Sequence, residues 1–246
     1  MNSGAKYVII VAGGKGQRMG GDIPKQFMLL DNRPVLMHTI KAYYDYDPEI
    51  RIVLALPYEQ ITYWEKLCAG YGFSIPHQLV SGGETRFHSV KNGLSLIEKQ
   101  LNKKANALIG VHDGVRPLVD TELIARVYEQ ADLKGAAYPV IPVIDSIRKL
   151  TDDFNTAVHP APCTVYPFSV PVDRSQYFLV QTPQVFEANM IKDAYKQEYT
   201  PDFTDDVSVV EASGVCCVAM VEGSRENIKI TTPVDLIIAQ ALMKRI

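Results

Sequence analysis

The segment from Tyr7 to Phe27, YVIIVAGGKGQRMGGDIPKQF, places a buried-strand pattern directly before a basic, glycine-rich loop. Tyr7 to Val11 is short, continuous, apolar and rich in β-branched residues, which is typical of a strand covered on both faces of a parallel sheet. The glycines that follow allow the backbone to turn sharply and to bring its N–H groups close to an anion. Lys15, Arg18 and Lys25 add three cations within eleven residues. This segment therefore predicts a strand followed by a polyphosphate-binding loop.

Two well-known phosphate loops do not fit the spacing of these glycines. The dinucleotide fingerprint requires G-x-G-x-x-G, but after Gly14 and Gly16 the next glycine is Gly20, one position too late. The P-loop requires Gly-Lys followed by Ser or Thr, whereas Lys15 is followed by Gly16. Taken by itself, the loop could also be an ordinary strand-to-helix turn with solvated lysines.

Strand patterns alternate with helix patterns along most of the chain. Short apolar runs at Ile50–Leu56 and Ala107–Val111 predict buried strands. Apolar residues recur at helical spacing in Arg33–Tyr44, where Pro34 would take the first helical position, and in Glu84–Leu101. This alternation implies βαβ units, and hence a Rossmann-like α/β fold with a mostly parallel sheet flanked by helices.

The alternation breaks after Ala136. Residues Ala137 to Lys149 hold two prolines and no helical period, and Asp152 to Val172 is loop-like with four prolines. A long irregular excursion inside a compact domain is usually functional, as a lid, an arm or an interface. We therefore expect a single domain over residues 1–246 with an arm at about 137–176; the alternative is a loose surface insertion.

The α/β pattern returns in the last third of the chain. Helices are predicted at Ala188–Tyr199 and Val207–Ser213, and strands at Val215–Val221 and Asn227–Thr231. The last helix has a clear start at Thr232, which is followed by a proline and, three residues on, by an acid in capping-box fashion.

Composition excludes several classes of protein. A hydrophobic content of 47% and a charged content of 22% are ordinary for a soluble globular protein, and a net charge of −3 argues against a nucleic-acid-binding surface. Every apolar run falls short of the roughly 18 residues of a membrane span, and Tyr7 to Ala12 is too short for a signal peptide core. We therefore expect a cytoplasmic protein with no membrane or nucleic-acid partner. The cysteines and histidines show no zinc-site spacing.

The predicted strand ends hold the candidate site residues, because ligands of open α/β sheets lie at the carboxyl ends of the strands. Gly82 and Gly83 permit a close backbone approach and Ser89 could bond a base or a ribose, although the glycines alone could form a simple turn. Asp113 follows a strand, and a carboxylate facing a phosphate loop fits a bridging Mg²⁺. A turn or capping aspartate is the alternative for Asp113.

No nucleophile motif accompanies these loops: G-x-S-x-G is missing, and so is a pairing of cysteine with histidine. This favours chemistry by positioning and charge, as in phosphoryl or nucleotidyl transfer.

Six blocks, taken in chain order, resemble the 2-C-methyl-D-erythritol 4-phosphate cytidylyltransferase family of the non-mevalonate isoprenoid pathway. They are AGGKGQRMGGDIPKQF, GGETRFHSV, HDGVRP, VQTPQVF, TDDVSVVEASG and NIKITTPVDL. The resemblance spans almost the whole chain. It implies a nucleotide-diphospho-sugar transferase fold, a homodimer formed through the arm, Mg²⁺ as cofactor, and transfer of CMP from CTP to methylerythritol phosphate with release of pyrophosphate.

The resemblance also implies roles for individual residues. Transition-state stabilisation and placement of the substrate phosphate would fall to the catalytic cations Arg18, Lys25, Arg174 and Lys229. CTP would be bound by Ala12, Gly13, Gly14, Lys15, Gly16, Gly82, Gly83, Ser89, Asp113 and Gly114. Methylerythritol phosphate would be contacted by Asp113, Arg116, Thr182 and Thr204, and Asp113 would also be the metal ligand. Since the arm crosses to the other subunit in this family, Arg174 and Thr182 would serve the partner's site.

Two departures from the family pattern stand out. The family usually has His-Asp-Ala where this chain has His112-Asp113-Gly114, which we expect only to loosen the backbone. The segment Ala157–Phe168 looks like extra length in the arm. Two other functions remain open: a ribitol- or other polyol-phosphate cytidylyltransferase, disfavoured by the TDDVSVVE block, and a non-catalytic nucleotide-binding protein, disfavoured by the intact set of cations and acid.

Overall fold

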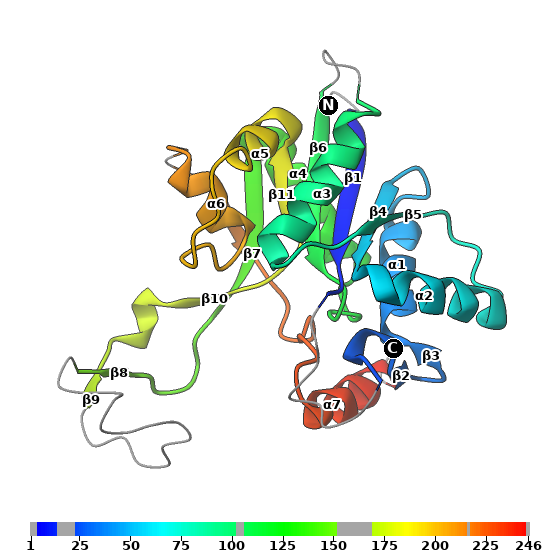
Figure 1. The fold of residues 1–246 in the computed structure, drawn as a ribbon. Helices are drawn as coiled ribbons and strands as arrows, with labels where there is room; N and C mark the ends of the chain where they lie inside the picture. The colour runs from blue at the N-terminus through cyan, green and yellow to red at the C-terminus, as the bar shows by residue number, and fades with distance from the viewer. Residues whose placement is uncertain (1–3, 14–22, 102–105, 152–168, 216, 245–246) are drawn as a thin grey trace.

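A mixed, mostly parallel sheet flanked by helices forms the body of the protein in the computed structural model, which describes residues 4–13, 23–101, 106–151, 169–215 and 217–244 (Figure 1). Its eight strands run in the order β10-β7-β11-β6-β1-β4-β5, with β12 paired to β7. Their bounds are β1 Ala5–Val11, β4 Arg51–Leu56, β5 Gln78–Ser81, β6 Ala107–Asp113, β7 Ala136–Pro142, β10 Phe178–Val180, β11 Gln184–Glu187 and β12 Ala219–Glu222. The predicted fold class is confirmed.

Parallel pairing joins β6, β1, β4 and β5, whereas β11 runs antiparallel to both β6 and β7. The helices are α1 Val35–Tyr46, α2 Tyr58–Tyr71, α3 Arg86–Glu98, α4 Thr121–Lys134, α5 Ala188–Ala194, α6 Asp206–Ala212 and α7 Pro233–Met243. The described structure also has two short 3₁₀ helices, η2 Lys25–Phe27 and η3 Arg174–Gln176. It has two small two-stranded sheets as well: β2 Leu29–Leu30 pairs with β3 Arg33–Pro34, and β8 Arg148–Leu150 pairs with β9 Ser169–Pro171.

Strand β1 is apolar throughout because both of its faces are covered. Tyr7 and Ile9 pack in the core cluster that includes residues of α3, α5 and α6. Val8 and Ile10 pack in the cluster on the other face, with residues of α1, α2 and α4. Since successive side chains of a strand point to opposite faces, only a continuous apolar run satisfies both layers.

The start of α1 differs from the prediction. Pro34 pairs in β3 and forms the N-cap, and the helix begins at Val35. The reason is a tight turn at Asp31 and Asn32, both at positive φ, which returns the chain antiparallel to β2 and leaves Pro34 extended at ψ 136°. Aspartate and asparagine are favoured in such hairpin turns.

Three predictions for the last third of the chain need correction. The strand predicted at Asn227–Thr231 is irregular backbone, in which the Ile230 N–H donates to the Val115 carbonyl at 2.9 Å. Helix α5 ends at Ala194, five residues before the predicted end, and β12 begins only at Ala219. Ile230 is fully buried, but buried and exposed side chains do not alternate around it as they would in a strand. Its apolar side chain therefore packs into the core from a loop.

The arm projects from the body between β7 and β10 (Figure 1). Its first predicted residues, Ala137–Pro142, belong to β7 of the main sheet, where Ala137 is fully buried. Beyond them, β8 and β9 pair only with each other, and η3 follows. The extra segment Ala157–Phe168 lies outside the described residues. Among the described helices, none has both the length and the apolar character to span a membrane.

Trp64, the only tryptophan of the sequence, is fully buried in α2 and depends on a neutral histidine. Its indole N–H donates to His77 Nε2 at 2.9 Å, while His77 Nδ1 lies 2.8 Å from the Ile75 carbonyl. A ring that accepts at Nε2 and donates at Nδ1 is the neutral tautomer. Burial lowers the pKa of His77, and the hydrogen bond to Ile75 opposes that shift only in part.

We predict that His77 makes the free energy of unfolding fall as the pH drops below about 6.5, the ordinary histidine value. Below that pH the unfolded chain binds a proton that the folded ring, with its lowered pKa, does not bind. Each such proton contributes a slope of up to about 1.4 kcal/mol per pH unit. The His77→Gln variant should therefore show a flatter dependence between pH 6.5 and pH 5, measured by urea unfolding followed through Trp64 fluorescence. Identical slopes in the two proteins would contradict this assignment.

Candidate active site

A pocket of about 230 Å³ opens at the carboxyl ends of β1 and β6. The register of the parallel pair β1 and β6 brings these two ends together, because Val11 at the end of β1 pairs with Asp113 at the end of β6. The pocket is lined by Val11, Ala12, Gly13, Lys25, Gln26, Gly83, Glu84, Thr85, Arg86, Ser89, Asp113, Val115 and Lys229. The predicted location of the site, at the strand ends, agrees with this arrangement.

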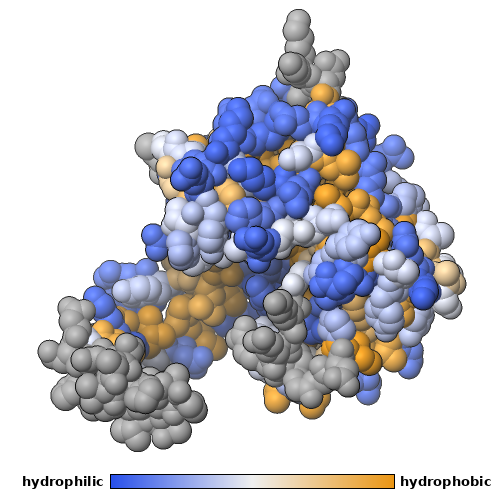
Figure 2. Space-filling view, viewed as in Figure 1, coloured by the Kyte–Doolittle hydropathy of each residue, from blue (hydrophilic) through white to orange (hydrophobic). Residues whose placement is uncertain are grey.

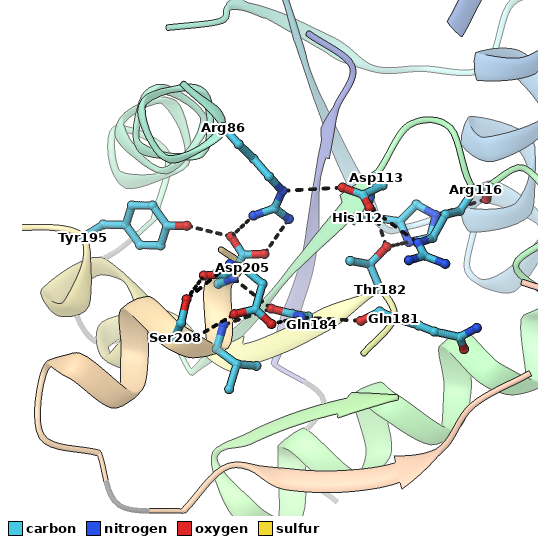
Figure 3. A network of polar contacts seen from close by, with 12 residues as sticks. Arg86, His112, Asp113, Arg116, Gln181, Thr182, Gln184, Tyr195, Asp205 and Ser208 are labelled. Carbon is cyan, nitrogen blue, oxygen red and sulfur yellow. Dashed lines mark hydrogen bonds and ion pairs between the residues drawn. The ribbon is translucent and has the colours of Figure 1, made fainter. Parts of the chain in front are cut away.

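Asp113 lines the pocket, and the described part of the chain places three cations around its carboxylate. Figure 3 shows two of them, Arg86 and Arg116. Lys229 Nζ is 2.9 Å from Oδ2, Arg116 Nε is 3.5 Å from Oδ2, and Arg86 Nε is 3.5 Å from Oδ1. Burial alone would raise the pKa of Asp113, but Arg86, Lys229 and Arg116 together hold it well below its usual value. The carboxylate is therefore ionised at any physiological pH.

Hydrogen bonds from the far end of the chain fix this strand end (Figure 3). The Asp113 N–H donates to Thr182 Oγ1 at 3.1 Å, and the same oxygen lies 3.1 Å from His112 Nδ1. Asn227 Nδ2 donates to the Thr182 carbonyl at 2.9 Å, and Arg116 Nη1 donates to the Asn227 carbonyl at 2.7 Å. Burial lowers the pKa of His112 to about 3, so this ring is neutral.

Thr182 contradicts one prediction. Its hydroxyl group lies within hydrogen-bonding distance of Asp113 and His112 in its own chain, so it belongs to its own site and not to the partner's. The predicted arm ends at about residue 176, so assigning Thr182 to the partner's site carried the role of the arm past its own end. In the structure, pairing of β10 with β7 has already returned the chain to the body before that residue.

Of the predicted site residues that the structure describes, six are missing from the pocket lining: Gly82, Gly114, Arg116, Thr182, Arg174 and Thr204. The first four lie next to a lining residue in the chain or contact Asp113, whereas the last two do not. Arg174 is in η3 on the arm, where its guanidinium donates to the Ile144 carbonyl. Thr204 is exposed and precedes Asp205, the N-cap of α6. The structure therefore brings Lys25, Asp113 and Lys229 together but leaves Arg174 and Thr204 away from them within one chain.

Only the beginning and the end of the glycine-rich loop are described. Ala12 and Gly13 line the pocket, whereas Gly14, Lys15, Gly16 and Arg18 lie outside the described residues. At the other end, η2 places Lys25 in the pocket, and the neighbouring Gln26 donates from Nε2 to the Ala12 carbonyl at 2.9 Å. The loop thus leaves β1 and returns to the same strand end.

Gly82, Gly83 and Ser89 form a tight turn beside the pocket. Ser89 Oγ accepts from the Gly83 N–H at 3.0 Å and donates to the Thr85 carbonyl at 3.0 Å. A Cβ at Gly83 would lie 2.4 Å from His88 Cβ, so only glycine fits there. The Ser89 hydroxyl therefore holds the shape of the turn, and Ser89 also lines the pocket.

Comparison with known proteins agrees with this geometry. A sequence model of the 2-C-methyl-D-erythritol 4-phosphate cytidylyltransferase family matches residues 6–245. The chain belongs to this family. A relative from Phocaeicola vulgatus with that name is 53% identical over 97% of this chain and 99% of its own length, and one from Bacteroides thetaiotaomicron is 53% identical over 96% and 98%.

Solved structures with similar names share the fold. A crystal structure of a 4-diphosphocytidyl-2C-methyl-D-erythritol synthase superposes with a TM-score of 0.77 at 26% identity, covering 98% of this chain and 99% of the other. The 2-C-methyl-D-erythritol 4-phosphate cytidylyltransferase of Francisella tularensis gives a TM-score of 0.74 at 30% identity, covering 96% and 99%.

Sequence reasoning missed one residue at the centre of this cytidylyltransferase site. Arg86 lines the pocket, and its Nη1 and Nη2 donate to the two carboxylate oxygens of Asp206 at 2.9 and 2.7 Å. The sequence did contain a sign of this role, because Arg86 lies in the GGETRFHSV block close to the glycines that had been assigned to the site. Asp206 had been assigned only to the start of a helix.

Gly114, where the cytidylyltransferase family usually has alanine, is a packing requirement in this chain. A Cβ there would lie 2.9 Å from Ala12 Cβ and 3.0 Å from Leu36 Cδ1. The backbone is not loose, because the Gly114 N–H donates to the Val11 carbonyl at 2.8 Å and its own carbonyl accepts from Thr39 Oγ1 at 3.0 Å. The glycine allows α1 and the start of the phosphate loop to approach β6.

We predict that Gly114→Ala destabilises the protein by about 1–3 kcal/mol, the usual cost of inserting a methyl group into a packed core. It should also weaken CTP binding, because the nearest displaced atom belongs to Ala12 in the pocket. Gly70→Ala is the matched control, since a Cβ at this position in α2 meets nothing within 4 Å. Chemical unfolding and CTP titration of the two variants measure both effects. Equal stability of the two variants would contradict the packing argument.

Proposed function

We propose that this chain transfers CMP from CTP to 2-C-methyl-D-erythritol 4-phosphate and releases pyrophosphate. The observation that carries the proposal is the pocket in which the ionised Asp113, with Lys229 beside it, faces Lys25 and the start of the glycine-rich loop. Family membership and relatives named for this activity support it. Glycine backbone, cations and one carboxylate are the groups that a triphosphate and a sugar phosphate require.

The chemistry needs charge stabilisation rather than a base. A phosphate oxygen of methylerythritol phosphate attacks the α-phosphorus of CTP and forms the new P–O bond. The bond from this phosphorus to the bridging oxygen breaks, and its electron pair leaves with pyrophosphate. Since the nucleophile is already an anion, the site only has to align it and to stabilise the charge that develops on the α-phosphate.

Residue roles follow from this scheme. Lys25 lines the pocket, so we assign it, with Arg18, to the developing charge on the α-phosphate. Lys229 is half-exposed and 2.9 Å from Asp113, which suits a cation that orients the incoming phosphate. We assign CTP to Ala12, Gly13, Gly14, Lys15, Gly16, Gly82, Gly83, Ser89, Asp113 and Gly114. Methylerythritol phosphate is assigned to Asp113, Arg116, Thr182 and Thr204.

The donor set fits a Mg²⁺ ion that arrives with the nucleotide. Within the described residues, no group of three or more His, Cys, Asp or Glu side chains could form a metal cage. Mg²⁺ typically binds one or two protein carboxylates together with substrate phosphates and water. Asp113 is ionised and faces the pocket, so it would be the protein ligand. When bound, the ion would neutralise phosphate charge and polarise the α-phosphate.

We infer that the protein acts as a homodimer through the arm. Strand β10 at the base of the arm exposes Phe178, Leu179 and Val180 by 43–52%, and Ile144 nearby is 59% exposed. Figure 2 has an apolar area at this junction of arm and body. Contiguous exposed apolar surface is typical of protein interfaces. A second copy seated there could receive Arg174 in its own site, which would explain why this cation lies away from its own pocket.

The substrate is tested by measuring pyrophosphate release from CTP and Mg²⁺ with methylerythritol phosphate and ribitol phosphate supplied separately. Faster turnover of methylerythritol phosphate is expected. Preference for ribitol phosphate would overturn the substrate assignment, and no release with either would favour a non-catalytic nucleotide-binding protein.

For Lys25 we predict that Lys25→Ala lowers kcat by about two orders of magnitude or more, the scale expected for losing one preorganised donor to the transition state. The affinity for CTP should fall less, because the other loop contacts remain. Steady-state kinetics and CTP titration separate the two effects. Lys41→Ala on α1, an exposed lysine that pairs with Asp45, is the control and should leave kcat unchanged. A near-normal kcat for Lys25→Ala would refute the role.

For Arg174 we predict complementation between subunits. Arg174→Ala and Lys25→Ala homodimers should each be nearly inactive, but mixed dimers should regain activity, because one of their two sites would contain both cations. Mixing must be confirmed with two affinity tags on the two variants. If confirmed mixed dimers show no recovery, Arg174 does not act in the partner's site.

A further inference from the structure

We propose that Asp206 is a positioning residue: it holds the Arg86 guanidinium away from Asp113 and so keeps the Asp113 carboxylate available to a magnesium–CTP complex. This inference rests on the proposed function, which assigns magnesium and CTP to the pocket. It gives a role to a buried ion pair that the proposed reaction scheme does not use.

The contacts of Arg86 divide unequally between two carboxylates. Nη1 and Nη2 donate to the two oxygens of Asp206 at 2.9 and 2.7 Å, the bidentate arrangement in which arginine and carboxylate bind most strongly. Figure 3 shows the Arg86 side chain extending toward Asp113. Only Nε faces Asp113, at 3.5 Å from Oδ1, which is long for a hydrogen bond. Arg86 therefore binds Asp206 more strongly than it binds Asp113.

The Asp206 side chain is itself held in place by several contacts. It is fully buried, and the Tyr195 hydroxyl donates to Oδ1 at 2.6 Å. The backbone N–H groups of Asp206 and Val207 both donate to Gln184 Oε1 at 2.9 Å, which fixes the first turn of α6 to β11. The Asp206 carboxylate is therefore a well-anchored partner for the two Nη atoms of Arg86.

Asp113, unlike Asp206, must keep one carboxylate oxygen available for the metal ion. A carboxylate can bind a divalent ion only with an oxygen that no strong ion pair occupies. Among the ion pairs of the described residues, Lys229 and Arg116 lie at Oδ2 and Arg86 lies at Oδ1 at 3.5 Å, so Oδ1 is the less engaged oxygen. If the Asp206 charge were removed, Asp113 would be the nearest remaining carboxylate of Arg86. A largely buried guanidinium is most stable when it pairs with both oxygens of a carboxylate, so Arg86 would then pair more strongly with Asp113. The metal ion would have to displace Arg86 in order to bind Asp113.

Asp206→Asn tests the proposal, because it removes the charge but keeps the shape and an acceptor for Tyr195. We would measure the dissociation constant of CTP by calorimetry with Mg²⁺ and, separately, in EDTA. Magnesium-dependent binding should weaken by about tenfold or more, the usual effect of losing a partner behind a metal ligand. Binding in EDTA should change little, because only the metal depends on the freed Asp113 oxygen.

A second variant separates this role from a structural one. Arg86→Gln/Asp206→Asn removes the competing cation together with its anchor, so the ratio of the CTP dissociation constant in EDTA to that in Mg²⁺ should return to near the wild-type ratio. The matched control is Tyr195→Phe, which removes one hydrogen bond to Asp206 without releasing Arg86. It should lower the unfolding temperature but leave the magnesium–CTP constant unchanged.

Equal weakening with and without Mg²⁺, or a double variant whose ratio of the two constants is as low as that of Asp206→Asn, would overturn the proposal. If Asp206→Asn alone does not fold, comparison of the double variant with wild type decides, and a ratio lower by about tenfold or more would again overturn it. A wild-type protein that binds magnesium–CTP but does not transfer CMP would contradict the proposed function and leave this inference intact.

Discussion

The rest of the site depends on the ionised carboxylate of Asp113. The guanidinium groups of Arg86 and Arg116 and the ammonium group of Lys229 come from α3, from the turn after β6 and from the segment before α7. Three cations this close would repel one another without an anion between them. Asp113 therefore joins three distant parts of the chain, and the cations in turn keep it charged despite its burial.

A second layer of contacts makes this centre rigid. Thr182, His112 and Asn227 connect β6 to the irregular segment that carries Lys229. This segment has no strand pairing of its own, so its position is set by side-chain and carbonyl contacts rather than by a ladder. A polar network of this kind is effective because its members are buried and mostly satisfied. The segment can thus be irregular and still hold a cation in a defined place.

The elements with a simple local cause could be predicted from the sequence. The continuous apolar run of β1 follows from two covered faces, and the strand-end location of the site follows from parallel topology. The strand expected at Asn227–Thr231 was wrong because a single buried side chain, Ile230, produces an apolar signal without an alternating pattern. Arg86 was missed because its importance lies in a pairing across 120 residues, which no local pattern contains. The role of Thr182 was misassigned because the role of the arm was carried past the end of the arm, where strand pairing has already returned the chain to the body.

The arm has one more consequence, which concerns how the chain tolerates change. Its two ends are held side by side by the pairing of Pro142 with Phe178 in the main sheet, so the arm is a long excursion closed at its base. The entropy cost of closing such a loop rises only with the logarithm of its length, by roughly 0.6 kcal/mol for each doubling. Residues could therefore be added to the arm beyond this closure with little effect on the stability of the body. The length of the arm and the architecture of the nucleotide site can thus change independently of each other.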